Sequence, residues 1–314
     1  MPDFLDLIKE KNRRLESIPE KFLSQVRKSE RQVYENVIQL LGQLEQRGGK
    51  FVASIENVRI AGQINAELKK ALYGSDYVKA VSEFASEFDI QNDLNFSYFK
   101  DVFELKKSSE LAAAITLQNK SNAIDLLLNR GADTDFVAPL RGIIENSVIT
   151  NASYKDTLFA IREFVEGNEN FDSRLVSYSR QIAHDTFAIA DRAVTSTYAD
   201  EVDADWFLYL GDVITTSRAF CKERHGNYYH WKEIAAWGAG KKTQGLRLPD
   251  SDGHWQGEID GTNKDTIFIY AGGYNCRHAI NAVSVAVVPK VVLQRNIDQG
   301  FYNPSDKEKE ILGL

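Results

Sequence analysis

The side chains best suited to bind a metal or to react are two cysteines, each followed closely by a histidine. Cys221 precedes His225 by four positions, and Cys276 precedes His278 by two. Thiolate sulfur and imidazole nitrogen are the ligands that structural Zn²⁺ prefers. The first spacing places both side chains on one side of a helix, and the second places them on one face of a strand. These four residues could therefore hold one zinc ion, and we predict no other cofactor.

Two other interpretations of the cysteines stay open. Free cysteine is among the most buried residue types, so Cys221 and Cys276 could simply pack two loops together. They could also form a disulfide, although the chain begins without the basic and apolar segments of a secretory signal, and we expect it to fold in a reducing cytoplasm. All three interpretations require the two cysteines to lie close in space.

An enzymatic role for the same region is the alternative hypothesis. Arg218 and Arg277 could clamp an anion, and three histidines nearby, His225, His230 and His254, could serve a metal-dependent nuclease or toxin-like enzyme. No His-Glu-x-x-His or paired Cys-x-x-Cys pattern supports this. Arginines beside buried segments usually bind backbone carbonyls or a carboxylate. We therefore predict that the protein has no catalytic residue and is not an enzyme.

Composition excludes two classes of partner. The chain has 314 residues, of which 43% are hydrophobic, and no apolar run approaches the length that spans a bilayer. Its net charge is −7 and its lysines and arginines form no cluster, which argues against binding nucleic acid through phosphate contacts. We expect neither membrane insertion nor sequence-specific binding of nucleic acid.

Residues 1–204 carry the pattern of a helical interaction or assembly domain. No proline occurs between Pro19 and Pro139, and apolar residues recur at helical spacing. The first predicted helix ends at Gly48–Gly49, and its apolar stripe is a candidate surface for a partner or for self-association, unless it packs on the next helices. The stripe consists of Leu23, Val26, Val33, Val37, Leu40 and Leu44. Further helices are predicted over residues 55–72, 76–88, 109–128, 135–148, 154–165 and 172–198.

Beyond residue 205 the pattern becomes β-like, so the predicted fold class is α+β. All four tryptophans and both cysteines lie in this part of the chain. Short runs of aromatic or β-branched residues predict strands over residues 206–210, 266–270 and 283–288. A helix is predicted over 230–237, a glycine-rich surface loop over 238–261, and either a solvated end or a terminal helix over 305–311. We expect a small α+β module over residues 205–292, with short strands and long loops, followed by a tail over 293–314.

The order of residues in this module resembles that of the phage minor head proteins typified by protein F of phage Mu, the head-morphogenesis family. The residues that carry the resemblance are Trp206, Thr215, Arg218, Cys221, His225, Gly226, Tyr228, Asn275, Cys276, Arg277 and His278, followed by an apolar run over 282–288. The chain departs from the family where Ala271–Tyr274 replaces a His-Pro approach to the second cysteine. It also lacks a second cysteine two residues after Cys221.

The resemblance implies a structural, non-enzymatic virion protein of a tailed bacteriophage. Such a protein is made in the host cytoplasm and lies inside the capsid near the portal vertex. Its expected partners are the portal and capsid proteins, and its expected role is to assist head morphogenesis, DNA packaging or ejection.

Overall fold

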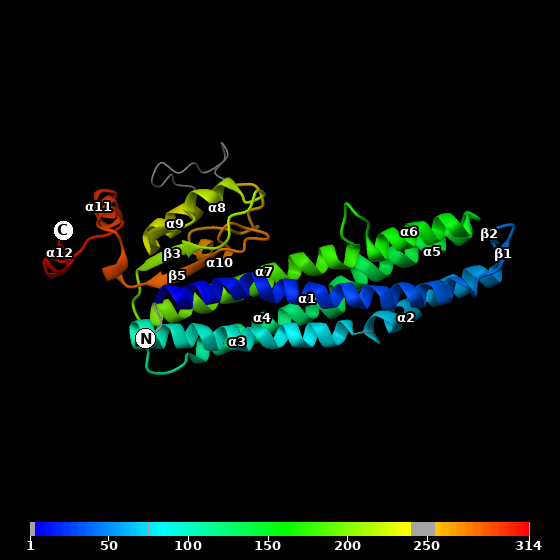
Figure 1. Ribbon diagram of the computed structural model, residues 1–314, viewed down its shortest axis with the longest axis horizontal. Coiled ribbons are helices and arrows are strands. Elements are labelled where there is room, and N and C mark those ends of the chain that lie inside the picture. The colour runs from blue at the N-terminus through cyan, green and yellow to red at the C-terminus, as the bar shows by residue number, and fades with distance from the viewer. Residues whose placement is uncertain (1–3, 75, 240–254, 314) are drawn as a thin grey trace. The chain divides into compact units, whose positions relative to one another are not determined.

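The structure is a computed structural model that describes residues 4–74, 76–239 and 255–313. It is mainly α-helical with a small antiparallel sheet, which confirms the predicted α+β class (Figure 1). The chain forms two compact units. Unit 1 is drawn from the ranges 1–17, 88–119 and 184–314, and unit 2 from 18–87 and 120–183. Four helices contribute residues to both units: α1 (Phe4–Leu41), α3 (Tyr77–Phe103), α4 (Glu110–Ile124) and α7 (Arg174–Glu201).

This division does not follow the predicted boundary at residue 204. In unit 1, helical side chains such as Tyr98, Phe99 and Tyr198 belong to the same buried cluster as Trp206 and Phe207 of the sheet. Composition changes near residue 205, but a three-stranded sheet with both faces apolar needs helices to cover it. These helices include α3, whose Tyr98 hydroxyl donates to the Ala282 carbonyl 184 positions away, and α7, which ends just before the sheet begins.

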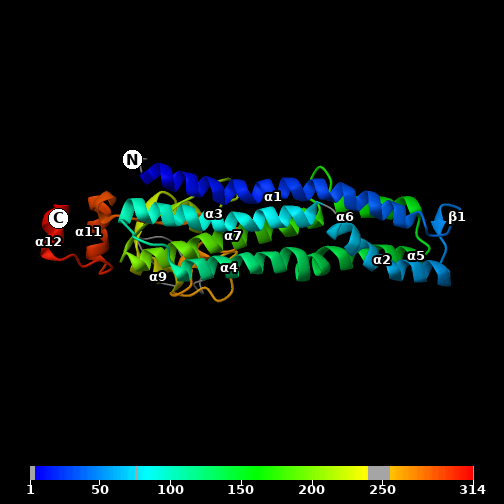
Figure 2. The ribbon, with the colours of Figure 1, turned by 90° about the horizontal axis from the view of Figure 1, so that it is seen from below.

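Unit 2 contains a set of short helices and one hairpin. Figure 2 shows α2 beside α5, and α5 beside α6. Serine side chains begin two of these helices, because Ser54 and Ser153 each accept a hydrogen bond from the backbone N–H three residues later. The elements of unit 2 are β1 (Gln46–Arg47), β2 (Lys50–Phe51), α2 (Ile55–Tyr73), the π-helical segments η1 (Asp125–Arg130) and η2 (Asp133–Val137), α5 (Ala138–Ile149) and α6 (Tyr154–Glu166).

Three tyrosines stabilise the first π-helical segment. The hydroxyls of Tyr178, Tyr77 and Tyr73 donate hydrogen bonds to the backbone carbonyls of residues 126, 127 and 128 respectively. A π-helical turn departs from the α-helical hydrogen-bond pattern, so additional donors to its carbonyls stabilise it. The helix predicted over 109–128 is therefore α-helical only as far as Ile124, where α4 ends, and continues as a π-helix from Asp125.

The apolar stripe of the first helix is part of the core, which corrects its predicted role as a partner surface. Leu23, Val26, Val33 and Val37 are fully buried, Leu44 is nearly so, and Leu40 is half-buried. Helix α1 also ends at Leu41, before the predicted stop. Gly48 and Gly49 instead form the hairpin turn between β1 and β2, since both have positive φ, as a two-residue turn of this kind requires.

The sheet of unit 1 has the order β4-β3-β5, with both pairings antiparallel. The central strand β3 (Trp206–Leu210) lies where it was predicted, whereas β4 (Asn227–His230) was not predicted. The last strand was predicted over residues 283–288, but β5 (Ala279–Val283) begins four residues earlier and ends at Val283. Most of the predicted run instead forms a 3-10 turn, η3 (Val285–Val287), which Ser284 caps. These strands bring residues 210 and 279 side by side.

Residues 266–270 form a short helix, α10 (Ile267–Tyr270), rather than the predicted strand. The reason is local, because the Asn263 N–H donates to the Thr266 hydroxyl and the Asn263 carbonyl accepts from the Ile267 N–H. This turn starts a helix despite the β-forming side chains. The remaining helices of unit 1 are α8 (Ala219–Arg224), α9 (Trp231–Gly238), α11 (Lys290–Asp298) and α12 (Asp306–Leu312). Helix α9 confirms a prediction, and α12 shows that the charged end, for which a solvated end was the alternative, is helical. Part of the predicted 238–261 loop lies outside the described residues.

A buried polar network joins three helical segments within unit 1. The carboxylate of Asp191 accepts hydrogen bonds from the side-chain amides of Gln91 and Asn95, both at 2.8 Å. Lys11 lies 4.0 Å from the same oxygen, and burial lowers its pKa. Such a network fixes the register of the helices because each member would be costly to leave unpaired.

Among the described helices, none is both long enough and apolar enough to cross a bilayer.

Candidate functional site

The two cysteines lie side by side in unit 1, as all three interpretations of them require. The sulfur of Cys221, on α8, is 3.9 Å from the sulfur of Cys276, which lies in the extended segment before β5. Both side chains are only 3% exposed, and they are 55 positions apart in sequence. The antiparallel pairing of β3 with β5 brings this segment back to the end of β3, which α8 follows closely in the chain.

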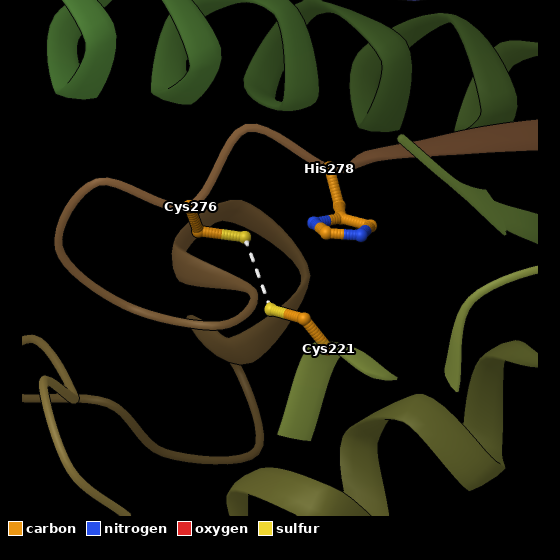
Figure 3. Close-up of side chains that lie close together, drawn as sticks. All are labelled: Cys221, Cys276 and His278. Atoms are coloured by element: carbon orange, nitrogen blue, oxygen red, sulfur yellow. Dashed lines mark hydrogen bonds between the residues drawn. The ribbon is translucent and has the colours of Figure 1, made fainter. Parts of the chain in front are cut away.

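His278 joins the two cysteines (Figure 3). One ligand atom from each of Cys221, Cys276 and His278 can be chosen so that all three atoms lie within 4.8 Å of one another. Cys276 and His278 are two residues apart in the segment that leads into β5, and both bring a ligand atom to Cys221. The predicted convergence of these three residues is therefore observed.

His225 is not in this group, which corrects the predicted set of four ligands. Helix α8 ends at Arg224, and the His225 N–H still donates to the Cys221 carbonyl at 2.9 Å, but the His225 side chain does not join the group formed by the two sulfurs and His278. The ring of His225 stands nearly perpendicular to that of His278, with 5.9 Å between the ring centroids. The turn at Gly226, whose φ is +73°, follows His225 directly and ends the helix.

Tyr209, which sequence reasoning did not single out, contacts all three residues. Its hydroxyl lies 3.4 Å from the Cys221 sulfur and 3.6 Å from the Cys276 sulfur. Its ring stacks on the His278 ring, with 5.1 Å between centroids and 19° between planes. Burial raises the pKa of Tyr209 well above its usual value, so the phenol keeps its proton. The β-strand pattern of residues 206–210 identified the strand but not this contact.

The two thiols have unequal acidity. The pKa of Cys221 is raised, because it shares a hydrogen bond with Cys276 and because it is buried. The pKa of Cys276 is lowered by the same hydrogen bond, with further help from His278 and Arg192. The hydrogen bond between the sulfurs therefore favours loss of one proton from the pair and opposes loss of the second.

Arginines bind backbone carbonyls around the cysteines, as the structural interpretation expected for Arg218. Arg218 donates to the carbonyls of Gly272 and Tyr274, at 3.2 and 2.6 Å. Arg192, on α7, donates to the carbonyls of Cys276 and His278, at 3.3 and 2.9 Å. Arg192 had no sequence signal, because a single arginine in a helix does not reveal which loop it contacts.

Gly272 allows the backbone to lie against the sulfurs. A Cβ atom at this position would be 2.5 Å from the Cys221 sulfur and 3.0 Å from the Cys276 sulfur. Gly211 plays a similar role beside His278, since a Cβ there would be 2.8 Å from the histidine Cα. Contacts this short do not occur for real side chains, so both positions need glycine.

The other predicted motif residues position the site without contacting the sulfurs. The exposed Thr215 offers its carbonyl to Lys222, and the Gly226 N–H donates to the Tyr209 carbonyl. Tyr228 lies on β4 opposite Leu208 of the central strand. Arg277 is half-buried and close enough to Glu16 to favour the charged form of that carboxyl.

His230, considered for acid or base chemistry, has a structural environment. Its ring nitrogen accepts a hydrogen bond from the Lys232 N–H at the start of α9, and the ring packs on Trp206 and Tyr302. Burial lowers the pKa of His230 to about 4, so the ring is neutral at physiological pH. His254 lies outside the described residues.

Comparisons of the chain with protein-family models, with curated proteins and with solved structures found no match. The resemblance to phage minor head proteins therefore stays a prediction that rests on the ordered residues of the module.

Proposed function

We propose that this chain is a structural minor head protein of a tailed bacteriophage, bound to the portal on the inner side of the capsid. The observation that carries the proposal is the 3.9 Å contact between Cys221 and Cys276. These residues mark the two ends of the ordered motif, and the family assignment requires them to meet across the intervening segment. If the two cysteines lay far apart, the assignment to this family would have no basis.

The burial of the site supports a structural role for the module. Cys221, Cys276 and His278 are each 3% exposed, so a dissolved substrate has little access to them. The nearby Arg218 and Arg192 are engaged with backbone carbonyls. Groups arranged in this way hold loops together, whereas a catalytic site needs reactive atoms that a substrate can reach.

The test is performed in the phage that encodes the chain. Mass spectrometry of purified heads should detect the protein at a few copies per particle, and the protein should copurify with the portal ring. Deleting the gene should reduce the yield of DNA-filled heads. Complementation with the wild-type chain should restore that yield.

Two glycine variants make a matched pair for this complementation. Gly272→Leu places a side chain against both sulfurs and should fail to restore heads, whereas Gly62→Ala has no atom within 4 Å of its new Cβ and should succeed. Particles that lack the protein and still fill normally would refute the proposal. DNA cleavage by the purified protein that disappears in His225→Ala would instead establish the nuclease alternative.

A further inference from the structure

The donor atoms around Cys221 have the composition of a zinc site. Two thiols and one imidazole converge, with their ligand atoms within 4.8 Å of one another, and these are the ligand types of Cys₂His zinc sites (Figure 3). Figure 3 shows the His278 ring with one nitrogen on the side of the two sulfurs. Three such groups gathered in an apolar interior are well placed to share a cation.

The distance between the sulfurs separates zinc binding from a disulfide. Two thiolates bound tetrahedrally at about 2.3 Å from Zn²⁺ lie about 3.8 Å from each other. The observed separation is 3.9 Å, so a zinc ion requires almost no movement of the sulfurs. A disulfide requires a separation of about 2.05 Å, so the two sulfurs would have to approach each other by nearly 2 Å.

The Tyr209 hydroxyl lies where a fourth ligand would be. In a tetrahedral site an oxygen ligand at about 2.0 Å from zinc lies about 3.5 Å from each thiolate sulfur. The observed distances from the Tyr209 oxygen are 3.4 and 3.6 Å. Its ring is held parallel to the His278 ring, so both groups present their polar atoms to the same region.

The surroundings fit a permanent rather than an exchangeable ion. Cys221, Cys276 and His278 are nearly inaccessible to solvent, and Arg192 holds the carbonyls of Cys276 and His278 in place. Outer contacts of this kind orient the ligands of a metal and raise its affinity. The His278 Nε2 atom is buried without a hydrogen-bond partner among the described residues, so this nitrogen has no hydrogen bond to lose when a metal binds.

From this geometry we propose that Cys221, Cys276 and His278 bind one structural Zn²⁺ ion, with the Tyr209 hydroxyl completing the tetrahedron. His225 is not a ligand. The ion would join α8 to the segment before β5 and so replace the disulfide that extracellular proteins use for the same purpose. This inference goes beyond the proposed function and does not depend on it.

The test measures metal in the full-length chain. Protein expressed in zinc-supplemented medium and purified without chelator should contain one zinc ion per chain by elemental analysis. Cys221→Ser, Cys276→Ser and His278→Asn should each lose most of this zinc. His225→Asn is the matched control, since it removes a neighbouring imidazole that lies outside the ligand group, and it should keep full occupancy.

A second measurement covers the case in which a ligand variant fails to fold. Replacing zinc by Co²⁺ in the wild-type chain should give the absorption bands of thiolate-bound, tetrahedral cobalt. Wild-type protein that has no stoichiometric zinc and no such bands, or that shows a Cys221–Cys276 disulfide by mass spectrometry, would overturn the inference. Loss of zinc in His225→Asn would overturn the ligand assignment. Neither result would affect copurification with the portal, so the two proposals can fail separately.

Discussion

The guanidinium of Arg192 donates a 2.9 Å hydrogen bond to the backbone carbonyl of His278, and through this contact a helix holds the segment that carries two of the three proposed ligands. Arg192 is 1% exposed and also donates to the carbonyls of Ile269 and Cys276. A single side chain therefore satisfies three carbonyls, one on α10 and two in the segment before β5. The stability of the site depends on a residue outside the motif.

Arg192→Ala should lower the free energy of unfolding by about 3 kcal/mol or more, because it leaves buried carbonyls without a donor. Urea denaturation followed by circular dichroism measures this change. Arg13→Ala is the control, since Arg13 is exposed and pairs with Glu10 one turn away, and it should leave the free energy of unfolding almost unchanged. An equal effect of both variants would contradict the role assigned to Arg192.

Two glycine-to-alanine variants should change stability in opposite directions. Gly272→Ala places a Cβ 2.5 Å from the Cys221 sulfur and should destabilise the protein by about 2 to 4 kcal/mol. Gly62→Ala, on the exposed face of α2, meets nothing within 4 Å and should stabilise it by about 0.5 to 1 kcal/mol through helix propensity. Thermal unfolding of both variants is the measurement, and a neutral Gly272→Ala would argue against tight packing at the sulfurs.

Removing the Tyr209 hydroxyl should weaken zinc binding without unfolding the sheet. Tyr209→Phe keeps the ring that stacks on His278 but loses the oxygen that lies near both sulfurs. We expect zinc affinity to fall by about 10- to 100-fold, measured by competition with a chromogenic chelator. Unchanged affinity in a folded variant would show that the hydroxyl is not part of the metal environment.

His230 should make the protein less stable in acid. Its folded-state pKa is about 4, below the ordinary 6.5, because the ring is buried. The unfolded chain therefore binds a proton first as pH falls, so up to about 3 kcal/mol of stability present above pH 6.5 is lost between about pH 6.5 and 4. His230→Asn keeps a capping oxygen for α9 and should lose less stability over this range, although lost ring packing lowers its stability at pH 7. Urea unfolding at several pH values measures the free energy of unfolding of both proteins. An equal loss in His230→Asn and wild type as pH falls would contradict this role of His230.

Glu30, in unit 2, should have the opposite pH dependence. Burial raises its pKa to about 7, although Ser173 and Val176 donate hydrogen bonds to it. Because the folded state binds this proton more tightly than the unfolded state, stability falls as pH rises from about 4.5 to 7, by up to about 3 kcal/mol. Glu30→Gln accepts the same hydrogen bonds without charge and should be more stable than wild type at pH 8, with equal stability near pH 4. A destabilised Glu30→Gln at pH 8 would show that the charged form is preferred.

Much of the fold could be predicted because its signals are local. Helical spacing identified most of the helices, and a dense aromatic and β-branched run identified β3. Predictions failed where a side-chain hydrogen bond outweighed intrinsic preference, as at Asn263 and Thr266 before α10, or where two glycines formed a hairpin turn rather than a helix end. The π-helical geometry of residues 125–130 was also beyond prediction, since the three tyrosines that stabilise it lie at least 48 positions away along the chain.

The sequence by itself determined that Cys221, Cys276 and His278 could form one site, because their side-chain chemistry and the two-residue spacing of the second pair are local properties. Only the tertiary structure decided that His225 is excluded, since its ring packs against the His278 ring instead of joining the two sulfurs. It also decided that Tyr209, Arg192 and Gly272 complete the site. Their roles arise from strand pairing and close packing between distant segments, and neither leaves a periodic pattern in the sequence.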